Sequence, residues 1–118
     1  MTQAAPAEIL LAEGRVQDAI GWLDRGIARF PGHPVLLNDR GLCHLLAAQL
    51  APATADFELA NQADPADAEY VSNLALAYAL NGDEDGARAL WSRVLTPADV
   101  NANLEIARAS RPRFANQR

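Results

Sequence analysis

The sequence contains no lysine, a single cysteine, few aromatic residues and no long hydrophobic run. Because Cys43 has no second cysteine to pair with, an intrachain disulfide is excluded and the redox compartment stays open. A membrane-spanning helix needs roughly 20 consecutive apolar residues, so we expect no membrane insertion by this chain. β-Branched residues are also sparse, whereas alanine and leucine supply most of the hydrophobic half, which favours helices over sheets.

Positive charge is scarce as well. Ten arginines face 15 acidic residues, for a formal net charge of −5 over 118 residues, a length that suits one domain. Four arginines lie among the last eleven residues, which contain no acid, so residues 1–107 carry a net charge of −9. An acidic body does not neutralise phosphates, so we expect no nucleic-acid partner. Residues 111–118 are expected to form a flexible basic tail.

A repeat of 34 residues runs through the chain. Shifting the sequence by that period places small residues on small ones and large residues on large ones. The superposed columns are Ala7, Gly41 and Ala75; Leu10, His44 and Tyr78; Gly14, Ala48 and Gly82; Ala19, Ala53 and Ala87; Leu23, Phe57 and Trp91; and Gly26, Ala60 and Val94. Within each unit these positions recur at helical spacing, which predicts pairs of helices.

The same columns indicate how the two helices of a unit pack. A small residue on one helix lets the two backbones approach, and a large side chain fills the space beside it. Trp91 lies in the large-residue column and is predicted to be core. Trp22 lies one position before that column, which predicts partial exposure on the outer face or a position against the next repeat.

These columns resemble the tetratricopeptide repeat over about residues 5–95. Residues 34–67 match its pattern of small, aromatic and proline positions through Gly41, Ala53, Phe57, Ala60 and Pro65. From residue 68 onward the matching residues are Ala75, Tyr78, Gly82, Ala87 and Trp91. The resemblance implies an all-α fold, a right-handed α-solenoid of three helix pairs.

We therefore expect one domain over residues 1–110, with repeats at about 5–33, 34–67 and 68–96. Thr96 and Pro97 are typical of a helix start, which predicts a C-terminal capping helix over 97–109. The predicted helices are 5–13, 16–29, 35–48, 52–63, 68–80, 84–95 and 97–109, with no strand.

Two stretches support a narrower resemblance. Residues 71–83 resemble the third-repeat helix of the TadD family, lipoproteins that assemble Flp (tight-adherence) pili, and residues 95–104 resemble that family's C-terminal cap. The resemblance implies a periplasmic protein attached to the outer membrane, which helps pilus secretion components assemble. Residues 1–6 have no signal-peptide pattern, and the family's lipidated N-terminal cysteine has no match, so such a signal would lie outside this sequence.

The sequence offers little for catalysis or cofactor binding. Cys43 and His44 are neighbours on a helix and point about 100° apart, so they cannot form a nucleophile–base pair. His33 has no ligand at metal-binding spacing. Residues 81–86 are reminiscent of a calcium loop, but Val94 stands where its later glutamate belongs, so these acids are expected to cap a helix. We predict no enzyme, no cofactor and no metal.

The resemblance also implies where a partner binds, because in this family the first helix of each pair lines the concave face. The matching positions of the second repeat are Val35, Asn38, Leu42, Leu45 and Leu46. Those of the third repeat are Glu69, Ser72, Leu76, Ala79 and Leu80, and the first repeat adds Glu8, Leu11 and Ala12. Leucines at non-core positions predict an apolar binding strip, unless the last helix or a second copy of the chain covers it.

The leading interpretation is a scaffold that binds an apolar helix or an extended peptide, with pilus assembly as its preferred setting. The alternative is a cytoplasmic adaptor or regulatory module from a longer protein, and an enzyme is a distant third. Residues upstream of Met1 in the natural gene would discriminate the first two, since a lipobox indicates the periplasm and a long extension the cytoplasm. A homo-oligomer is compatible with either interpretation.

Overall fold

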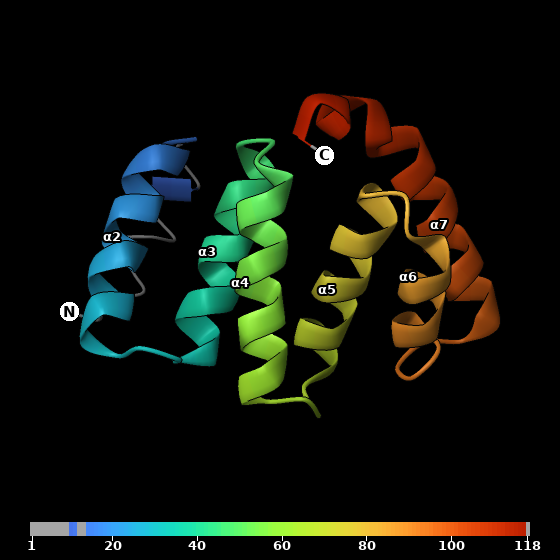
Figure 1. Ribbon diagram of the computed structural model, residues 1–118, viewed down its shortest axis with the longest axis horizontal. Coiled ribbons are helices and arrows are strands. Elements are labelled where there is room, and N and C mark those ends of the chain that lie inside the picture. The colour runs from blue at the N-terminus through green and yellow to red at the C-terminus, as the bar shows by residue number, and fades with distance from the viewer. Residues whose placement is uncertain (1–9, 12–13, 118) are drawn as a thin grey trace.

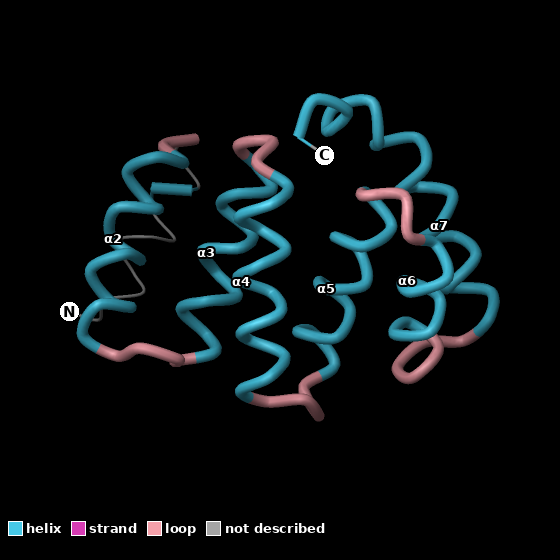
Figure 2. The backbone as a smooth tube through the Cα atoms, in the orientation of Figure 1, coloured by secondary structure: helices cyan, strands magenta, loops and turns pink. Residues whose placement is uncertain are grey.

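The computed structural model describes residues 10–11 and 14–117, all of which belong to helices or to the turns between them (Figures 1 and 2). This part of the chain contains no strand, as predicted. Its elements are α2 (Val16–Arg29), α3 (Pro34–Leu46), α4 (Leu50–Ala63), α5 (Ala68–Leu80), α6 (Glu84–Trp91), α7 (Pro97–Ser110) and the 3-10 helix η1 (Arg111–Gln117). Leu10 and Leu11 are helical, and the rest of the predicted helix 5–13 lies outside the described residues.

Successive helices pack against one another in a row. α2 contacts α3, α3 contacts α4, α4 contacts α5, and α5 contacts α6. Figure 1 shows this row side by side, with α7 beyond α6 and the end of the chain curving back above α5. The body measures 41 × 30 × 22 Å. α3–α4 and α5–α6 are therefore two consecutive helix pairs, and α7 covers the open side of the second pair.

Three helix boundaries differ from the prediction by two residues or more, and the first is the end of α3, which lies at Leu46 instead of residue 48. α4 begins at Leu50 instead of residue 52, because Pro52 is tolerated anywhere in a first turn, where the backbone N–H groups have no partner. α6 ends at Trp91 instead of residue 95. Arg93 N bonds Leu90 O at 3.1 Å and Val94 N bonds Trp91 O at 3.0 Å, so the chain tightens into i→i−3 turns there.

The start of α7 was predicted correctly. Thr96 caps the helix, since its Oγ1 accepts a hydrogen bond from the backbone N–H of Asp99 at 3.2 Å, and Pro97 occupies the first turn. Val100, Leu104 and Ala107 are buried, whereas Asn101, Glu105 and Arg108 are exposed. α7 is therefore the amphipathic cap that the end of a helical array requires.

The core follows the alternation of small and large residues. Phe57 of α4 lies directly against Gly41 of α3, and both are buried. In the next pair Trp91 is buried and its indole N–H donates to Ser72 Oγ at 3.0 Å. The largest buried cluster runs from α4 to η1 and contains both aromatic side chains. The packing positions predicted for Gly41, Phe57 and Trp91 are thus confirmed.

Each tight turn between paired helices contains a left-handed residue. Gly14 (φ 75°) and Gly82 (φ 91°) adopt this conformation without steric cost, and both stand in the glycine column of the repeat. Ala48 stands in the same column and has φ 59°. The repeat therefore imposes the turn geometry even where an alanine must be strained to make it.

The chain end differs from the expected frayed tail. Residues Arg111–Gln117 form η1, and the side chain of Phe114 is buried with 3% exposure. The Arg111 guanidinium donates to the carbonyl oxygen of Ala79 at 3.0 Å and forms an ion pair with Glu84. Phe114 and Arg111 hold this segment against the body of the protein. The basic composition of the segment predicted neither contact.

A charged network joins three consecutive helices. Arg40 of α3 donates twice to the carboxylate of Asp56 on α4, both at 2.8 Å, and once to Asp24 on α2 at 2.9 Å. These hydrogen bonds hold the pKa of Arg40 above its ordinary value. His44 lies beside the same carboxylate, with its Nε2 3.7 Å from Asp56 Oδ2. Arg40 is therefore a structural residue that joins α2, α3 and α4.

Candidate functional site

An apolar hollow of about 440 Å³ lies between the first helices of the two pairs and the end of the chain. We call it the leucine groove. Its lining residues are Leu11, Leu42, Leu45, Leu46, Leu76, Leu80, Ile106, Ser110, Arg113 and Phe114. The only polar side chains among these described residues are those of Ser110 and Arg113, so the surface offers apolar contact far more than hydrogen bonding.

Helical spacing builds the groove. Leu42, Leu45 and Leu46 follow one another at i, i+3 and i+4 on α3, and Leu76 and Leu80 are one turn apart on α5. The inner members of this set pack against the buried cluster, whereas Leu46 remains 58% exposed. The groove therefore has a floor that belongs to the core and a rim that is open to a partner.

Apart from Glu8, Ala12 and Glu69, ten residues were predicted for the groove, and four of them do not line it. Asn38 is buried between α3 and α5, where it donates to Glu69 Oε2 and accepts from Asn73 Nδ2, both at 2.9 Å. Its amide is already engaged in holding the two helices in register. A ligand would have to break those hydrogen bonds to use it, which is unfavourable for a buried amide.

The other three predicted residues lie elsewhere. Ala79 is fully buried, and its carbonyl oxygen receives Arg111. Ser72 accepts the hydrogen bond from Trp91, and Val35 lies in a separate hollow formed with α2. The predicted residues Glu8 and Ala12 lie outside the described part of the chain, and Glu69 is held by Asn38.

One whole wall of the groove was not predicted from the sequence. Ile106, Ser110, Arg113 and Phe114 come from α7 and η1, which the sequence presented as a solvating cap and a tail. Ile106 is 62% exposed and stands off the buried stripe of α7. An isoleucine on the polar side of an amphipathic helix was the signal that could have indicated this wall. Phe114 of η1 belongs to the buried cluster against which Leu42, Leu45 and Leu76 pack.

The residues considered for chemistry are held in structural roles. Cys43 is fully buried, and burial together with the nearby charge of Asp39 raises the pKa of its thiol to about 11. His44 shares a hydrogen bond with Gln49 through Nδ1 at 2.9 Å. Asp83 caps α6 by accepting from the N–H of Gly86 at 2.9 Å, as the capping interpretation of residues 81–86 predicts.

Metal sites and membrane spans were also sought in the described part of the chain. Over residues 10–11 and 14–117, no group of three or more histidine, cysteine or acidic side chains is placed to hold a metal ion. Within the same residues, none of the helices combines the length and the apolar character that a membrane crossing demands.

Comparison with solved structures supports the repeat. The chain is similar to the crystal structure of the Sgt2 TPR domain from Aspergillus fumigatus, with a TM-score of 0.77 and 22% sequence identity over 98% of this chain and 80% of that chain. The chain therefore has the fold of a tetratricopeptide-repeat domain. No family model and no curated protein sequence matches the chain, so the narrower resemblance to TadD proteins is not supported.

Proposed function

We propose that this chain is a non-enzymatic protein-interaction module that binds an apolar helix or an extended apolar peptide in the leucine groove. The observation that carries the proposal is the exposure of Leu46 (58%) and Ile106 (62%), which come from separate helices and line the same hollow. Contiguous exposed aliphatic surface of this kind is typical of a binding site. The likeness to a tetratricopeptide-repeat domain supports the same function class.

The test needs a ligand and two matched variants. Amphipathic helical peptides selected from a displayed library supply the ligand. Leu46→Glu changes the rim of the groove, and Leu59→Glu changes a leucine on α4 that is 47% exposed and outside the groove. Leu42 and Leu76 are less suitable because they also pack against the core.

Titration calorimetry then compares the two variants. We expect Leu46→Glu to weaken binding by about 2 kcal/mol, since it places a charge at an apolar anchor. Leu59→Glu should leave the affinity of the peptide unchanged. Equal binding by wild type and Leu46→Glu, with both proteins folded by circular dichroism, would place the site away from the groove.

The biological setting stays a prediction. A role in pilus assembly rests on the resemblance of residues 71–83 and 95–104 to TadD proteins, and a cytoplasmic adaptor is the alternative. Either setting uses the same groove, so the binding test does not separate them. Crosslinking and pull-down from the native organism would, because the first predicts pilus or secretion components as partners and the second predicts cytoplasmic proteins.

A further inference from the structure

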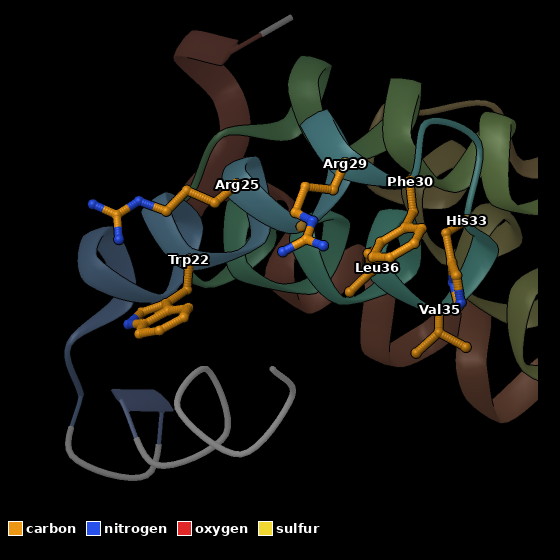
Figure 3. A pocket seen from close by; sticks show the side chains of 8 residues that line it. Trp22, Arg25, Arg29, Phe30, His33, Val35 and Leu36 are labelled. Carbon is orange, nitrogen blue, oxygen red and sulfur yellow. The ribbon is translucent and has the colours of Figure 1, made fainter. Parts of the chain in front are cut away.

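A second hollow lies at the other end of the row of helices. It measures about 550 Å³ and shares no described lining residue with the leucine groove. Its lining residues are Trp22, Arg25, Gly26, Arg29, Phe30, His33, Val35 and Leu36. Figure 3 shows these side chains along α2 and the start of α3. We call it the α2 pocket.

The shape of the pocket follows from α2 and the turn after it. Trp22, Arg25 and Arg29 recur at i, i+3 and i+7, so they lie along one side of α2. After Phe30 the chain reverses, with the N–H of His33 donating to the carbonyl oxygen of Phe30 at 3.2 Å. The reversal carries Val35 and Leu36 back to the same place.

The floor and wall of the pocket are apolar and open. Phe30 is 51% exposed and Val35 is 45% exposed. With Leu46 and Ile106 they make up four of the five large apolar side chains found exposed in the described part of the chain. Exposed apolar surface is therefore concentrated in the two hollows, which sets the α2 pocket apart from ordinary surface.

Its charge is opposite to that of the protein as a whole. The Arg25 guanidinium carbon lies over the ring of Trp22, 5.8 Å from its centre, and that of Arg29 lies over the ring of Phe30, 5.6 Å from its centre. Neither forms a hydrogen bond or ion pair with another described residue. Asp24, the acid that precedes Arg25 in sequence, is engaged by Arg40.

We propose that the α2 pocket binds a protein segment in which an apolar side chain stands next to a carboxylate. The apolar side chain packs on Phe30, Val35 and Leu36, and the carboxylate accepts hydrogen bonds from Arg29. A guanidinium that stacks on an aromatic ring keeps its in-plane N–H groups available, so Arg29 can hold the carboxylate without leaving Phe30. Arg25, one turn away, adds long-range attraction for an acidic segment. This local attraction contrasts with the net charge of −5 on the chain as a whole.

The test uses synthetic decapeptides that pair Glu with Leu or Phe, each matched by a peptide with Gln in place of Glu. Trp22 lies in the pocket and Trp91 is buried, so tryptophan fluorescence reports binding. We expect the full-length protein to bind the Glu peptides about tenfold more tightly than the Gln peptides, because a charge-assisted hydrogen bond is lost in the latter.

Two double variants of equal net charge provide the control. Arg25→Gln with Arg29→Gln should abolish the preference for Glu, whereas Arg88→Gln with Arg93→Gln, on and just after α6, should retain it. Phe30→Ser should weaken both peptide types, and Leu46→Glu should weaken neither, which separates this pocket from the leucine groove. All the altered side chains are exposed, so circular dichroism is expected to show folded variants.

Three outcomes would overturn the proposal. One is equal affinity of wild type for Glu and Gln peptides, and another is equal loss of preference in both double variants. The third is self-association of the wild type, seen by sedimentation, that Phe30→Ser abolishes, since a second copy of the chain would then be the occupant.

Discussion

The ring of Phe57 occupies the space that a side chain at position 41 would need. A Cβ placed on Gly41 would lie 2.6 Å from Cε1 of Phe57 and 2.7 Å from its Cδ1. The ring itself is fully buried between α3 and α4, so it has no direction in which to withdraw. The closeness of this helix pair therefore depends on the absence of one methyl group.

Gly41→Ala should lower the free energy of unfolding by about 1–3 kcal/mol, the usual effect of overpacking a core. Gly21→Ala is the matched control, because Gly21 lies within α2, is exposed, and has no atom within 4 Å of a built Cβ. That change should raise the free energy of unfolding by about 0.5–1 kcal/mol through helix propensity. Urea unfolding measures both values, and a harmless Gly41→Ala would contradict the packing described here.

Ala48→Gly should stabilise the protein. An alanine at φ 59° carries steric strain of about 1–2 kcal/mol, and the extra unfolded-state entropy of glycine returns only about half of it. Ala47→Gly is the control, since Ala47 has φ −84° and gains nothing from glycine. We expect opposite shifts of the thermal unfolding midpoint for the two neighbours. A lower midpoint for Ala48→Gly would mean that this turn is not strained.

The ion pairs that hold η1 should make stability depend on acid pH. Hydrogen bonds from Arg108 and Arg111 lower the pKa of Glu84 from 4.5 to about 2. Because the folded-state pKa is the lower one, the stabilisation is complete above pH 4.5 and is lost as the pH falls toward 2. The unfolding midpoint of the wild type should therefore fall across this range.

Glu84→Gln should remove that part of the pH dependence. Glu58→Gln, which deletes the same charge on α4 where no ion pair with a described arginine is formed, should retain it. High salt should reduce the difference between the two variants at pH 5, because Glu84 and Arg108 are accessible to solvent. Identical pH profiles for both variants would show that the ion pairs of Glu84 do not contribute to stability.

Phe114→Ala should expose the floor of the leucine groove. Phe114 belongs to the same buried cluster as Leu80, and both line the groove. We expect the variant to bind more of an apolar dye. Its free energy of unfolding should fall by less than is typical of a buried Phe→Ala change, which is about 3–5 kcal/mol, because η1 can detach without unfolding the rest. Phe30→Ala, at an already exposed ring, should not increase dye binding. No increase for Phe114→Ala would mean that another side chain covers the floor.

The helices were predictable because the repeat presents each packing position two or three times. α2 and α5 have the predicted bounds, and the Gly41–Phe57 contact follows from matching small and large columns. The start of α4 and the end of α6 were not predictable in the same way. The helix turn before Pro52 and the turn after Trp91 depend on local hydrogen bonding that a repeat does not encode.

The candidate site was only partly predictable. Leu42, Leu46 and Leu76 could be placed on one surface because the resemblance to the tetratricopeptide repeat implies it, whereas the burial of Asn38 depends on hydrogen bonds to another helix. The wall formed by Phe114 depends on how the chain returns after α7, which no periodicity reports. The α2 pocket was not predicted, because it lies outside the positions that the repeat family uses for binding. Only the partial exposure of Trp22 was expected.

The ion pairs of Arg40 with Asp24 and Asp56 tie the second repeat to its position after the first. The residues 34 positions after Arg40 and Asp56 are Leu74 and Leu90, so the next unit has no such bridge. If the second unit were transplanted behind the third, Arg40 would meet Ser92 at the position that corresponds to Asp24. The Arg40 side chain is partly buried, so the loss of a charged partner lowers stability. The repeats share their packing columns, but they are not interchangeable in order. A protein with shuffled repeats should therefore be less stable than the common columns suggest.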